Sequence, residues 1–175
     1  MLYTLSVDVS FIYMATDLHN LIIVESPSKA KTLKRFLGDD YQIEASVGHI
    51  RDLPKNELGV DVDNGFKPTY VASKDKSKVI TQLKKLLKNA STLYLATDPD
   101  REGEAIAWHL MELLDPKIPV KRLAFHEITK TAIQESFDHI RDIDQSLVSA
   151  QETRRILDRL WGHLVSKKLW FNVKG

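Results

Sequence analysis

The order of hydrophobic and polar positions predicts a chain in which strands and helices alternate. Short apolar runs fit buried strands, whereas apolar residues at every third or fourth position fit helices that bury one face. The predicted strands cover residues 21–24, 41–46, 66–72, 93–97 and 120–125. The predicted helices cover residues 27–37, 76–87, 130–141 and 145–161, with one more that follows a loop over 98–104 and ends near residue 114. This alternation is typical of an α/β fold with a parallel sheet and right-handed crossovers.

Turn and cap residues set the limits of the first helix. Ser26 offers a side-chain oxygen for the N-cap, Pro27 suits the first helical position, and Gly38 suits the position just after the helix. Residues 48–65 are rich in turn residues and lack a helical period, so they are predicted to form a long loop.

Three regions of the chain differ in character. Residues 1–20 lack the basic start of a signal peptide and are too short for a membrane span; an extra strand, a flexible tail and a misplaced start site remain open for this extension. Residues 21–142 hold the alternating pattern and are predicted to form the main domain. Residues 143–175 are predicted to begin a second, helical domain. No later run reaches 18 apolar residues, so a membrane is not an expected partner.

Composition narrows the class of protein. The chain has 175 residues, with 25 Lys and Arg against 24 Asp and Glu, and no cysteine. The hydrophobic fraction of 43% and the charged fraction of 28% are ordinary globular values and exclude collagen-like and wholly disordered classes. The lack of cysteine excludes disulfides, thiol catalysis and cysteine-based zinc sites from this stretch, and it fits a reducing compartment such as the cytoplasm.

The nearly neutral total hides strong local charge. Residues 74–88 hold six lysines and one aspartate, and residues 151–175 hold six basic and two acidic residues. Residues 98–104, in contrast, hold four carboxylates and one arginine. Basic surfaces around one acidic focus favour a polyanionic partner with a bound divalent cation, although any single basic run is equally typical of a solvated helix face.

Acidic side chains follow two of the predicted strands. Glu25 ends the first strand, and Asp98 and Asp100 follow a later one, with Glu102 and Glu104 just beyond. In open parallel sheets, ligands gather outside the carboxyl ends of the strands. Oxygen-only ligands point to Mg²⁺ rather than zinc, and Mg²⁺ usually binds one or two carboxylates plus phosphate oxygens. A carboxyl that like-charge repulsion keeps protonated would serve as a general acid.

Each motif alone has a simpler explanation. An Asp-x-Asp pair in a loop is most often a turn or a helix cap, Lys29 fits a solvated helix face, and His109 fits a packing position. The six histidines show no metal-binding spacing such as His-Glu-x-x-His. Neither the phosphate-binding loop of ATPases nor the glycine-rich dinucleotide loop occurs in the sequence.

Five sequence blocks in a fixed order are far more specific than any single motif. They are ESPSKAKT, SVGHIRDLP, LATDPDREGEAIAWH, AFHEITKTAI and RRILDRLWGHLVSKKLW. Together, over about residues 21–171, they resemble the amino-terminal part of the type IA DNA topoisomerases, of the bacterial topoisomerase I kind. The resemblance implies a Toprim fold, a Rossmann-like parallel sheet flanked by helices and followed by the helical start of a second domain.

The resemblance also implies roles for individual residues. Glu25 matches a general acid/base near the scissile phosphate, and Lys29 matches a lysine that helps to position this phosphate. Arg101 lies in the acidic loop, where it would neutralise carboxylates or contact phosphate. The implied Mg²⁺ ligands are Glu25, Asp98, Asp100 and Glu102. The implied DNA contacts are His49, Arg154, Arg155, Asp158, Arg159, His163 and Trp170, of which His163 stands where the family commonly has tyrosine and Trp170 offers a stacking face.

The implied activity is ATP-independent relaxation of negatively supercoiled DNA by a monomeric isomerase, in the cytoplasm and associated with the nucleoid. A tyrosine cuts one strand and forms a 5′-phosphotyrosine link, which conserves the bond energy until the strand is resealed. None of the five tyrosines here lies in the family's tyrosine motif, so this chain is expected to lack the nucleophile and to be inactive alone. The alternatives are a Toprim primase or nuclease, and a non-catalytic module that binds metal and single-stranded DNA.

Overall fold

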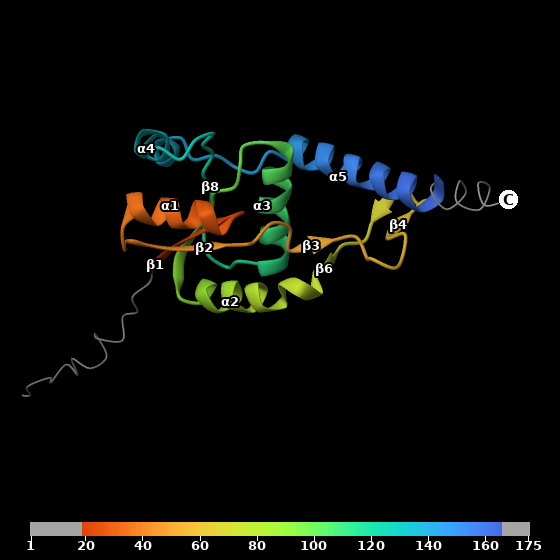
Figure 1. The fold of residues 1–175 in the computed structure, drawn as a ribbon, viewed down its shortest axis with the longest axis horizontal. Coiled ribbons are helices and arrows are strands. Elements are labelled where there is room, and N and C mark those ends of the chain that lie inside the picture. The colour runs from red at the N-terminus through yellow and green to blue at the C-terminus, as the bar shows by residue number, and fades with distance from the viewer. Residues whose placement is uncertain (1–18, 166–175) are drawn as a thin grey trace, which may run out of the picture.

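A four-stranded sheet of parallel strands forms the centre of the computed structural model, which describes residues 19–165 (Figure 1). The strand order is β2-β1-β7-β8, so β1 and β7 lie in the middle of the sheet. The strands are β1 (His19–Val24), β2 (Tyr41–Ala45), β7 (Ala90–Leu95) and β8 (Val120–Arg122). The predicted α/β class with a parallel sheet is confirmed.

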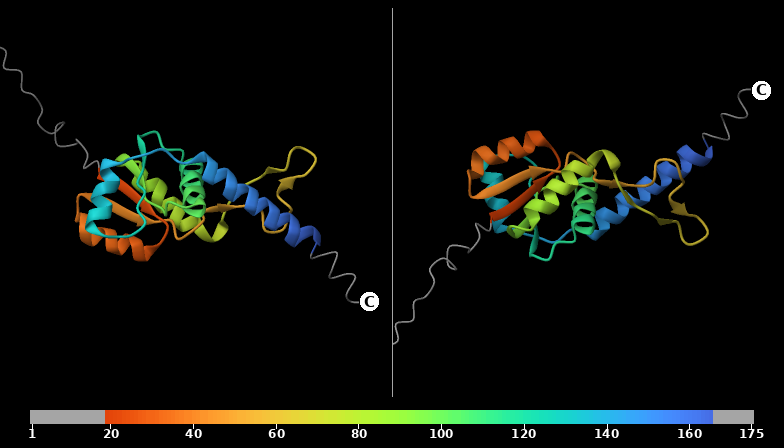
Figure 2. Two further views of the ribbon diagram at one scale, coloured as in Figure 1. Left: turned by 90° about the horizontal axis from the view of Figure 1, so that it is seen from above. Right: turned by 90° about the horizontal axis from the view of Figure 1, so that it is seen from below.

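Helices cover both faces of this sheet (Figures 1 and 2). One core lies between the sheet and the pair α1 and α4, and a second core lies between the sheet and the pair α2 and α3. The helix α5 packs against α3 and extends away from the sheet. The helices are α1 (Pro27–Leu37), α2 (Ser77–Leu87), α3 (Arg101–Leu114), α4 (Lys130–Asp138) and α5 (Gln145–Leu160); a short 3₁₀ helix (Lys74–Lys76) precedes α2, and a π-helical turn (Trp161–Val165) follows α5.

The strand β1 shows why the middle strands read as continuous apolar runs. Leu21 and Ile23 belong to the core under α2 and α3, and Ile22 and Val24 belong to the core under α1 and α4. Each of these side chains is at most 1% exposed. Because helices cover both faces of a parallel sheet, both sides of its strands bury apolar side chains. Full burial of one such side chain contributes about 1.5–3 kcal/mol.

The limits of α1 agree with its predicted cap residues. The Ser26 side chain accepts the backbone N–H of Lys29 at 3.3 Å, and Pro27 is the first helical residue. Gly38 has a φ of +67° and its N–H donates to the Lys34 carbonyl, which ends the helix. This cap fixes the direction in which α1 leaves the sheet edge.

The segment between β2 and α2 differs from the prediction. Residues 48–65 contain two short strands, so the prediction of an unbroken loop is wrong, and the single strand expected over 66–72 is split in two. Each of the resulting pairs, β3 with β6 and β4 with β5, is antiparallel. Strands of two residues carry no hydrophobic period, so the pattern held no signal for them. The four strands are β3 (Arg51–Asp52), β4 (Val60–Asp61), β5 (Lys67–Pro68) and β6 (Val71–Ala72).

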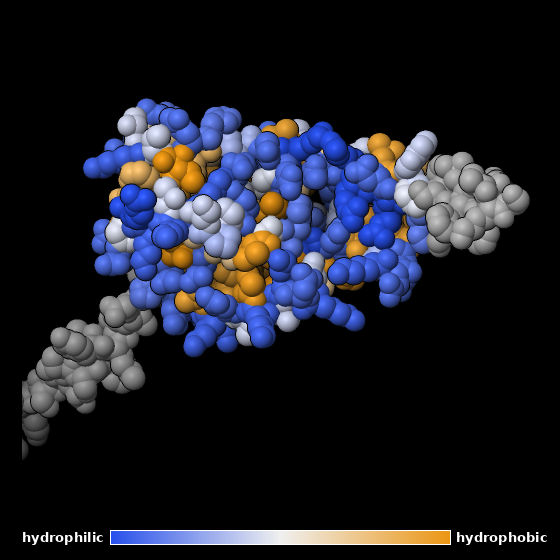
Figure 3. All heavy atoms as spheres, in the orientation of Figure 1, coloured by the Kyte–Doolittle hydropathy of each residue, from blue (hydrophilic) through white to orange (hydrophobic). Residues whose placement is uncertain are grey.

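The surface of the molecule is mainly hydrophilic in the view of Figure 3, with apolar residues in small groups. Within residues 19–165, no helix has both the length and the apolar composition that a bilayer crossing requires. The extension expected over residues 1–20 falls almost wholly outside the described residues, and the expected domain boundary near residue 142 stays a prediction.

Candidate functional site

The carboxyl ends of β1 and β7 bring Glu25, Lys29 and Asp98 together. The two strands are neighbours, with Ile23 opposite Leu95, so Glu25 and Asp98 leave the sheet at the same edge. Lys29 lies in the first turn of α1, and its Nζ forms an ion pair with Glu25 and, at 2.5 Å, with Asp98 Oδ1. Burial alone would lower the pKa of Lys29, but hydrogen bonds to Asp98 and Glu25 raise it above its ordinary value. The ammonium group therefore stays charged between the two carboxylates.

One oxygen of Glu25 has no partner. Its Oε1 pairs with Lys29, whereas Oε2 is buried and forms no hydrogen bond within the described part of the chain. A buried polar atom without a partner costs about 1–3 kcal/mol, and more when the group is charged. This buried oxygen is therefore a candidate ligand for a cation.

The acidic loop between β7 and α3 is held tightly. Asp100 Oδ1 accepts the N–H of Gly103 at 2.7 Å and forms the N-cap of α3. The helix therefore begins at Arg101, and the prediction of a loop as far as residue 104 is wrong. A Cβ atom on Gly103 would lie 2.1 Å from the carbonyl oxygen of Asp98, so this close approach requires glycine. From the sequence, a helix cap is the simpler explanation of the Asp-x-Asp pair. This explanation is correct for Asp100, whose Oδ1 caps α3.

Glu104 points into the protein, away from the acidic edge. Its side chain is 0% exposed and pairs with Arg122 at 2.7 Å and with Arg141 at 2.6 Å. Burial would raise the pKa of Glu104, but the hydrogen bonds from Arg141 and Arg122 hold it below its ordinary value. Neither arginine belongs to a sequence motif. The signal for Arg122 is a charged residue inside a predicted buried strand, because a buried charge requires a partner.

His49 borders the same edge from the turn after β2. The backbone N–H of Gly48 donates to the Glu25 carbonyl at 2.8 Å, which ties this turn to the end of β1. Gly48 adopts a φ of +80°, which favours glycine. His49 Nε2 lies 3.6 Å from Glu102 Oε1 in the first turn of α3, and both side chains are partly exposed. Arg101, at the start of the same helix, is exposed.

The donors at this edge suit a Mg²⁺ ion that shares its coordination with a phosphate. Within residues 19–165, no three Asp, Glu or His side chains lie close enough to hold a metal ion by themselves. Mg²⁺ commonly binds through one or two carboxylates, with water and phosphate oxygens as its other ligands. Glu25, with its unpartnered oxygen, and Asp98 offer such a pair. Asp100 lies in the acidic loop and Glu102 in the first turn of α3. Their roles as metal ligands stay predictions.

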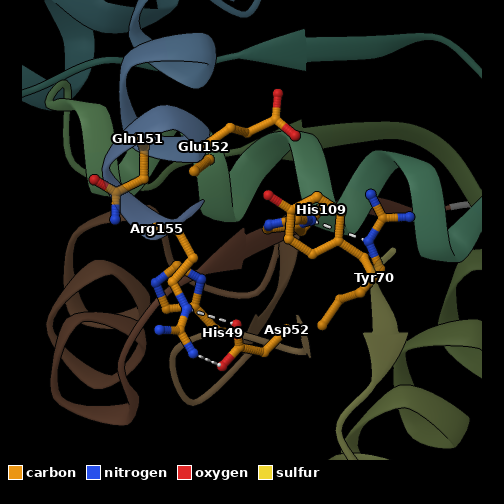
Figure 4. A pocket seen from close by; sticks show the side chains of 9 residues that line it. His49, Asp52, Tyr70, His109, Gln151, Glu152 and Arg155 are labelled. Carbon is orange, nitrogen blue, oxygen red and sulfur yellow. Dashed lines mark hydrogen bonds and ion pairs between the residues drawn. The ribbon is translucent and has the colours of Figure 1, made fainter. Parts of the chain in front are cut away.

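A cavity of about 100 Å³ lies beside the acidic edge, with His49 in its lining (Figure 4). It is formed by α3, by α5 and by the segment between residues 49 and 70. Its lining consists of His49, Arg51, Asp52, Tyr70, Ala105, His109, Gln151, Glu152 and Arg155. The lining holds two arginines, Arg51 and Arg155, and two carboxylates, Asp52 and Glu152. Because these charges balance, the cavity is polar but has no net positive charge to attract an anion.

Arg51 lies over two aromatic rings next to this cavity, and the two rings also contact each other edge to face. Its guanidinium carbon lies 4.9 Å from the ring centre of Trp108 and 5.2 Å from that of Tyr70. Its Nε donates to His109 Nδ1 at 3.0 Å, which fixes a neutral imidazole with the proton on Nε2. Burial, and then the charge of Arg51, lower the pKa of His109 to about 3. His109 is 4% exposed, which fits the packing position expected for it.

The arginines of α5 differ in their surroundings. Arg155 forms a bidentate pair with Asp52, with N–O distances of 2.8 and 2.7 Å (Figure 4). Arg159 donates to three backbone carbonyls of the loop after β3, those of Leu53, Pro54 and Glu57. Arg154 and Asp158 are both exposed and lie 3.7 Å apart. The DNA contacts assigned to these four residues stay predictions.

Two further expected DNA contacts lie near the carboxyl end of the chain. His163 is half-buried in the π-helical turn after α5, and Trp170 lies outside the described residues. The structure therefore brings Glu25, Lys29 and Asp98 into contact, with Asp100, Arg101 and Glu102 in the adjacent loop and first turn of α3. The candidates on α5 lie along the helix that extends away from the sheet (Figure 1).

The family of this chain follows from its fold and from comparison with known proteins. Residues 20–128 match the family model of the Toprim domain, and the chain belongs to this family. The chain is 57% identical over 166 residues to DNA topoisomerase 1 of Streptomyces coelicolor, and 54% identical over 167 residues to DNA topoisomerase 1 of Synechococcus elongatus. These matches cover 87% of this chain but only 17% and 19% of the two relatives.

A solved structure supports the same relationship. Full-length topoisomerase I from Thermotoga maritima matches this chain with a TM-score of 0.80 and 47% sequence identity. The match covers 86% of this chain and 26% of the Thermotoga chain. The resemblance to bacterial topoisomerase I that the five sequence blocks predict is confirmed.

Proposed function

We propose that this chain is the Toprim part of a type IA DNA topoisomerase and that its acidic edge binds Mg²⁺ beside a DNA phosphate. The observation that carries the proposal is the trio Glu25, Lys29 and Asp98, with the buried Glu25 oxygen that has no partner. Two carboxylates and one ammonium group on adjacent strand ends offer oxygen ligands to a cation and a donor to a phosphate. The names of the relatives support DNA as the substrate.

The residues at this edge divide the chemistry between them. In cleavage, the protonated form of Glu25 gives its proton to the leaving 3′ oxygen, while the attacking tyrosine hydroxyl of the parent enzyme loses its own proton to water as its bond to phosphorus forms. Resealing reverses both transfers, so Glu25 takes a proton from the attacking 3′ hydroxyl and the tyrosine regains one from water. Lys29 donates to a non-bridging oxygen of the phosphate and holds it in place. Arg101 and His49 border the same site and donate hydrogen bonds to adjacent phosphates of the DNA backbone. When bound, Mg²⁺ neutralises phosphate charge and helps to align the two DNA ends.

The arm formed by α5 grips the single-stranded segment in this proposal. Arg154, Arg155 and Arg159 supply positive charge for phosphates, and Asp158, His163 and Trp170 complete the contact set. The parent enzyme acts as a monomer at the nucleoid in the bacterial cytoplasm. It needs no ATP, because the phosphotyrosine link stores the energy of the broken phosphodiester bond.

The isolated chain is expected to bind DNA without cutting it. Incubation with negatively supercoiled plasmid and Mg²⁺ should leave the topoisomer distribution unchanged, because none of its tyrosines lies in the family's tyrosine motif. Agarose gels would report relaxation, and a denaturing gel with labelled oligonucleotide would report covalent adducts.

Two results of this assay would contradict the proposal. Efficient plasmid relaxation by the pure chain would show that a nucleophile is present after all. Nicked plasmid without covalently bound protein would favour the Toprim nuclease alternative. The control is the Asp98→Asn/Asp100→Asn variant, in which asparagine keeps the N-cap of α3 while both charges are lost.

A further inference from the structure

A buried charged pair lies directly behind the acidic edge. Glu104 of α3 and Arg122 at the end of β8 are both 0% exposed. Arg122 uses all five of its N–H donors within the protein. Nε and Nη2 donate to Glu104, a second Nη2 hydrogen goes to the Asp98 carbonyl at 2.8 Å, and Nη1 donates to the carbonyls of Leu95 and Leu123. One side chain thus fixes the ends of β7 and β8 and the first residue of the acidic loop.

The other oxygen of Glu104 reaches the start of α5. Glu104 Oε2 accepts the backbone N–H of Asp144 at 3.0 Å. Asp144 is the N-cap of α5, and its own side chain accepts the N–H groups of Ser146 and Leu147. Glu104 also pairs with the half-buried Arg141. The pair is therefore bonded to the acidic loop on one side and to the start of the α5 arm on the other.

Stability alone does not explain this arrangement. Removing two charges from water is costly, and well-packed apolar residues of similar volume often replace a buried ion pair without loss of stability. The guanidinium group of arginine carries five N–H donors in one fixed plane, and neither an apolar residue nor lysine can replace this arrangement. What the pair adds is a defined position for three carbonyls and one amide.

We propose that Arg122 and Glu104 are positioning residues that hold the Asp98 backbone and the start of α5 in one fixed arrangement, so that the Mg²⁺ site and the DNA-binding arm keep their mutual geometry. This inference rests on the proposed function for the role of the metal and the DNA. Arg122 and Glu104 touch neither the cation nor the phosphate; they act through Asp98 and Asp144. Groups that orient metal ligands from behind commonly change metal affinity 10- to 100-fold when they are replaced.

The test compares the full chain with the double variant Glu104→Leu/Arg122→Met. NMR measures three quantities: the ¹³C′ shift of Asp98, the hydrogen-exchange rate of the Asp144 amide, and the Kd for Mg²⁺ from amide shifts in residues 98–104, with a single-stranded oligonucleotide present. The variant should fold, with a shifted Asp98 carbonyl, faster exchange at Asp144 and a Kd about tenfold higher. If the double variant does not fold, Glu104→Gln keeps the shape and one acceptor oxygen and should move the same quantities in the same direction.

Arg141→Gln is the matched control. It removes the half-buried partner of Glu104 and leaves every hydrogen bond of Arg122 in place, so the Asp98 shift and the Mg²⁺ affinity should stay close to wild type. A folded double variant with the wild-type Asp98 shift, Asp144 exchange and Kd would overturn the positioning role. Failure of the proposed function has a different signature, since the wild-type chain itself would then show no Mg²⁺-dependent shifts. In that case the Asp98 shift and the Asp144 exchange rate still test the positioning role: changes in the double variant support it, and wild-type values contradict it.

Discussion

Lys29 forms ion pairs with both carboxylates of the acidic edge. Its ammonium group contacts Glu25 and Asp98 at once and occupies the position that a cation would take between them. In the proposed complex this ammonium turns to the phosphate, and Mg²⁺ gains access to the carboxylates. If the edge binds Mg²⁺ as proposed, Lys29 and the metal ion would compete for Asp98 in the DNA-free chain.

Replacement of Lys29 by methionine should tighten Mg²⁺ binding to the DNA-free chain. The variant removes a positive charge a few ångströms from the bound ion, and repulsion of about 1 kcal/mol in a well-hydrated edge corresponds to roughly a fivefold lower Kd. Isothermal titration with MgCl₂ measures it. Lys31→Met, an exposed position on the same helix, is the control and should change the Kd little. Equal or weaker binding by Lys29→Met would contradict competition for Asp98.

For single residues, the sequence predicts a place in the site when this place follows from the topology of the sheet. It does not predict a place that depends on a side-chain partner elsewhere in the chain. Glu25 and Asp98 were identifiable because carboxyl ends of parallel strands share an edge. Arg122 and Arg51 were not, because their partners are 18 and 58 residues away in the chain. A pattern with a period of two or 3.6 residues carries no information on such pairings.

At the scale of elements, α5 is attached to the main domain through its inner side. Arg155 binds Asp52 at the end of β3 and Arg159 binds the loop that follows, while Arg154 is exposed beside Asp158. The adjacent arginines 154 and 155 thus have different tasks despite the same chemistry. The side chain of Arg154 is open to solvent, whereas Arg155 holds the arm in place through Asp52 and adds its charge to the DNA-facing set only as a second task.

Two neighbouring substitutions separate these tasks. Arg154→Gln should weaken binding to a single-stranded oligonucleotide and reduce the slope of log K against log salt by about 1, with little change in stability. Arg155→Gln should lower the free energy of unfolding by up to about 1 kcal/mol, because its pair with Asp52 is partly exposed. Fluorescence anisotropy and urea denaturation measure the two effects. Identical behaviour of the variants in both assays would refute the division.

The long elements were predictable and the short ones were not. The strand β1 and the helix α1 follow from an apolar run and from strong cap residues, and α1 has the predicted limits. The pairs β3–β6 and β4–β5 form between segments too short to show a period. Their positions depend on tertiary contacts, such as the bond from the Thr69 amide to the Gly59 carbonyl at 2.8 Å.

At the scale of the whole molecule, buried polar groups make stability depend on pH. His109 is neutral in the folded protein, since its pKa is lowered to about 3, whereas an unfolded histidine has a pKa near 6.5. The unfolded state therefore binds more protons between these values. The contribution of the neutral His109 side chain to stability is complete above about pH 6.5 and is lost as the pH falls toward 3. Arg51, His49, Asp52 and Tyr70 are the charged and titratable groups around it.

The variant His109→Gln should have a flatter pH profile. Glutamine retains an acceptor for Arg51 but does not titrate, so between pH 7 and pH 5 the wild type should lose about 2 kcal/mol more stability than the variant. Urea unfolding at both pH values gives the four free energies. Parallel profiles would show that His109 is not buried in a neutral form.

The most direct test of the central claim is a Mg²⁺ titration of the chain with a bound single-stranded oligonucleotide, followed by amide NMR. The metal site at the carboxyl ends of β1 and β7 predicts saturable shifts confined to the surroundings of Glu25 and to residues 98–104. The variant Asp98→Asn/Asp100→Asn, which keeps the N-cap of α3, should abolish them. Shifts that persist in this variant, or no shifts up to about 10 mM Mg²⁺ in the wild-type complex, would contradict the assignment of these carboxylates.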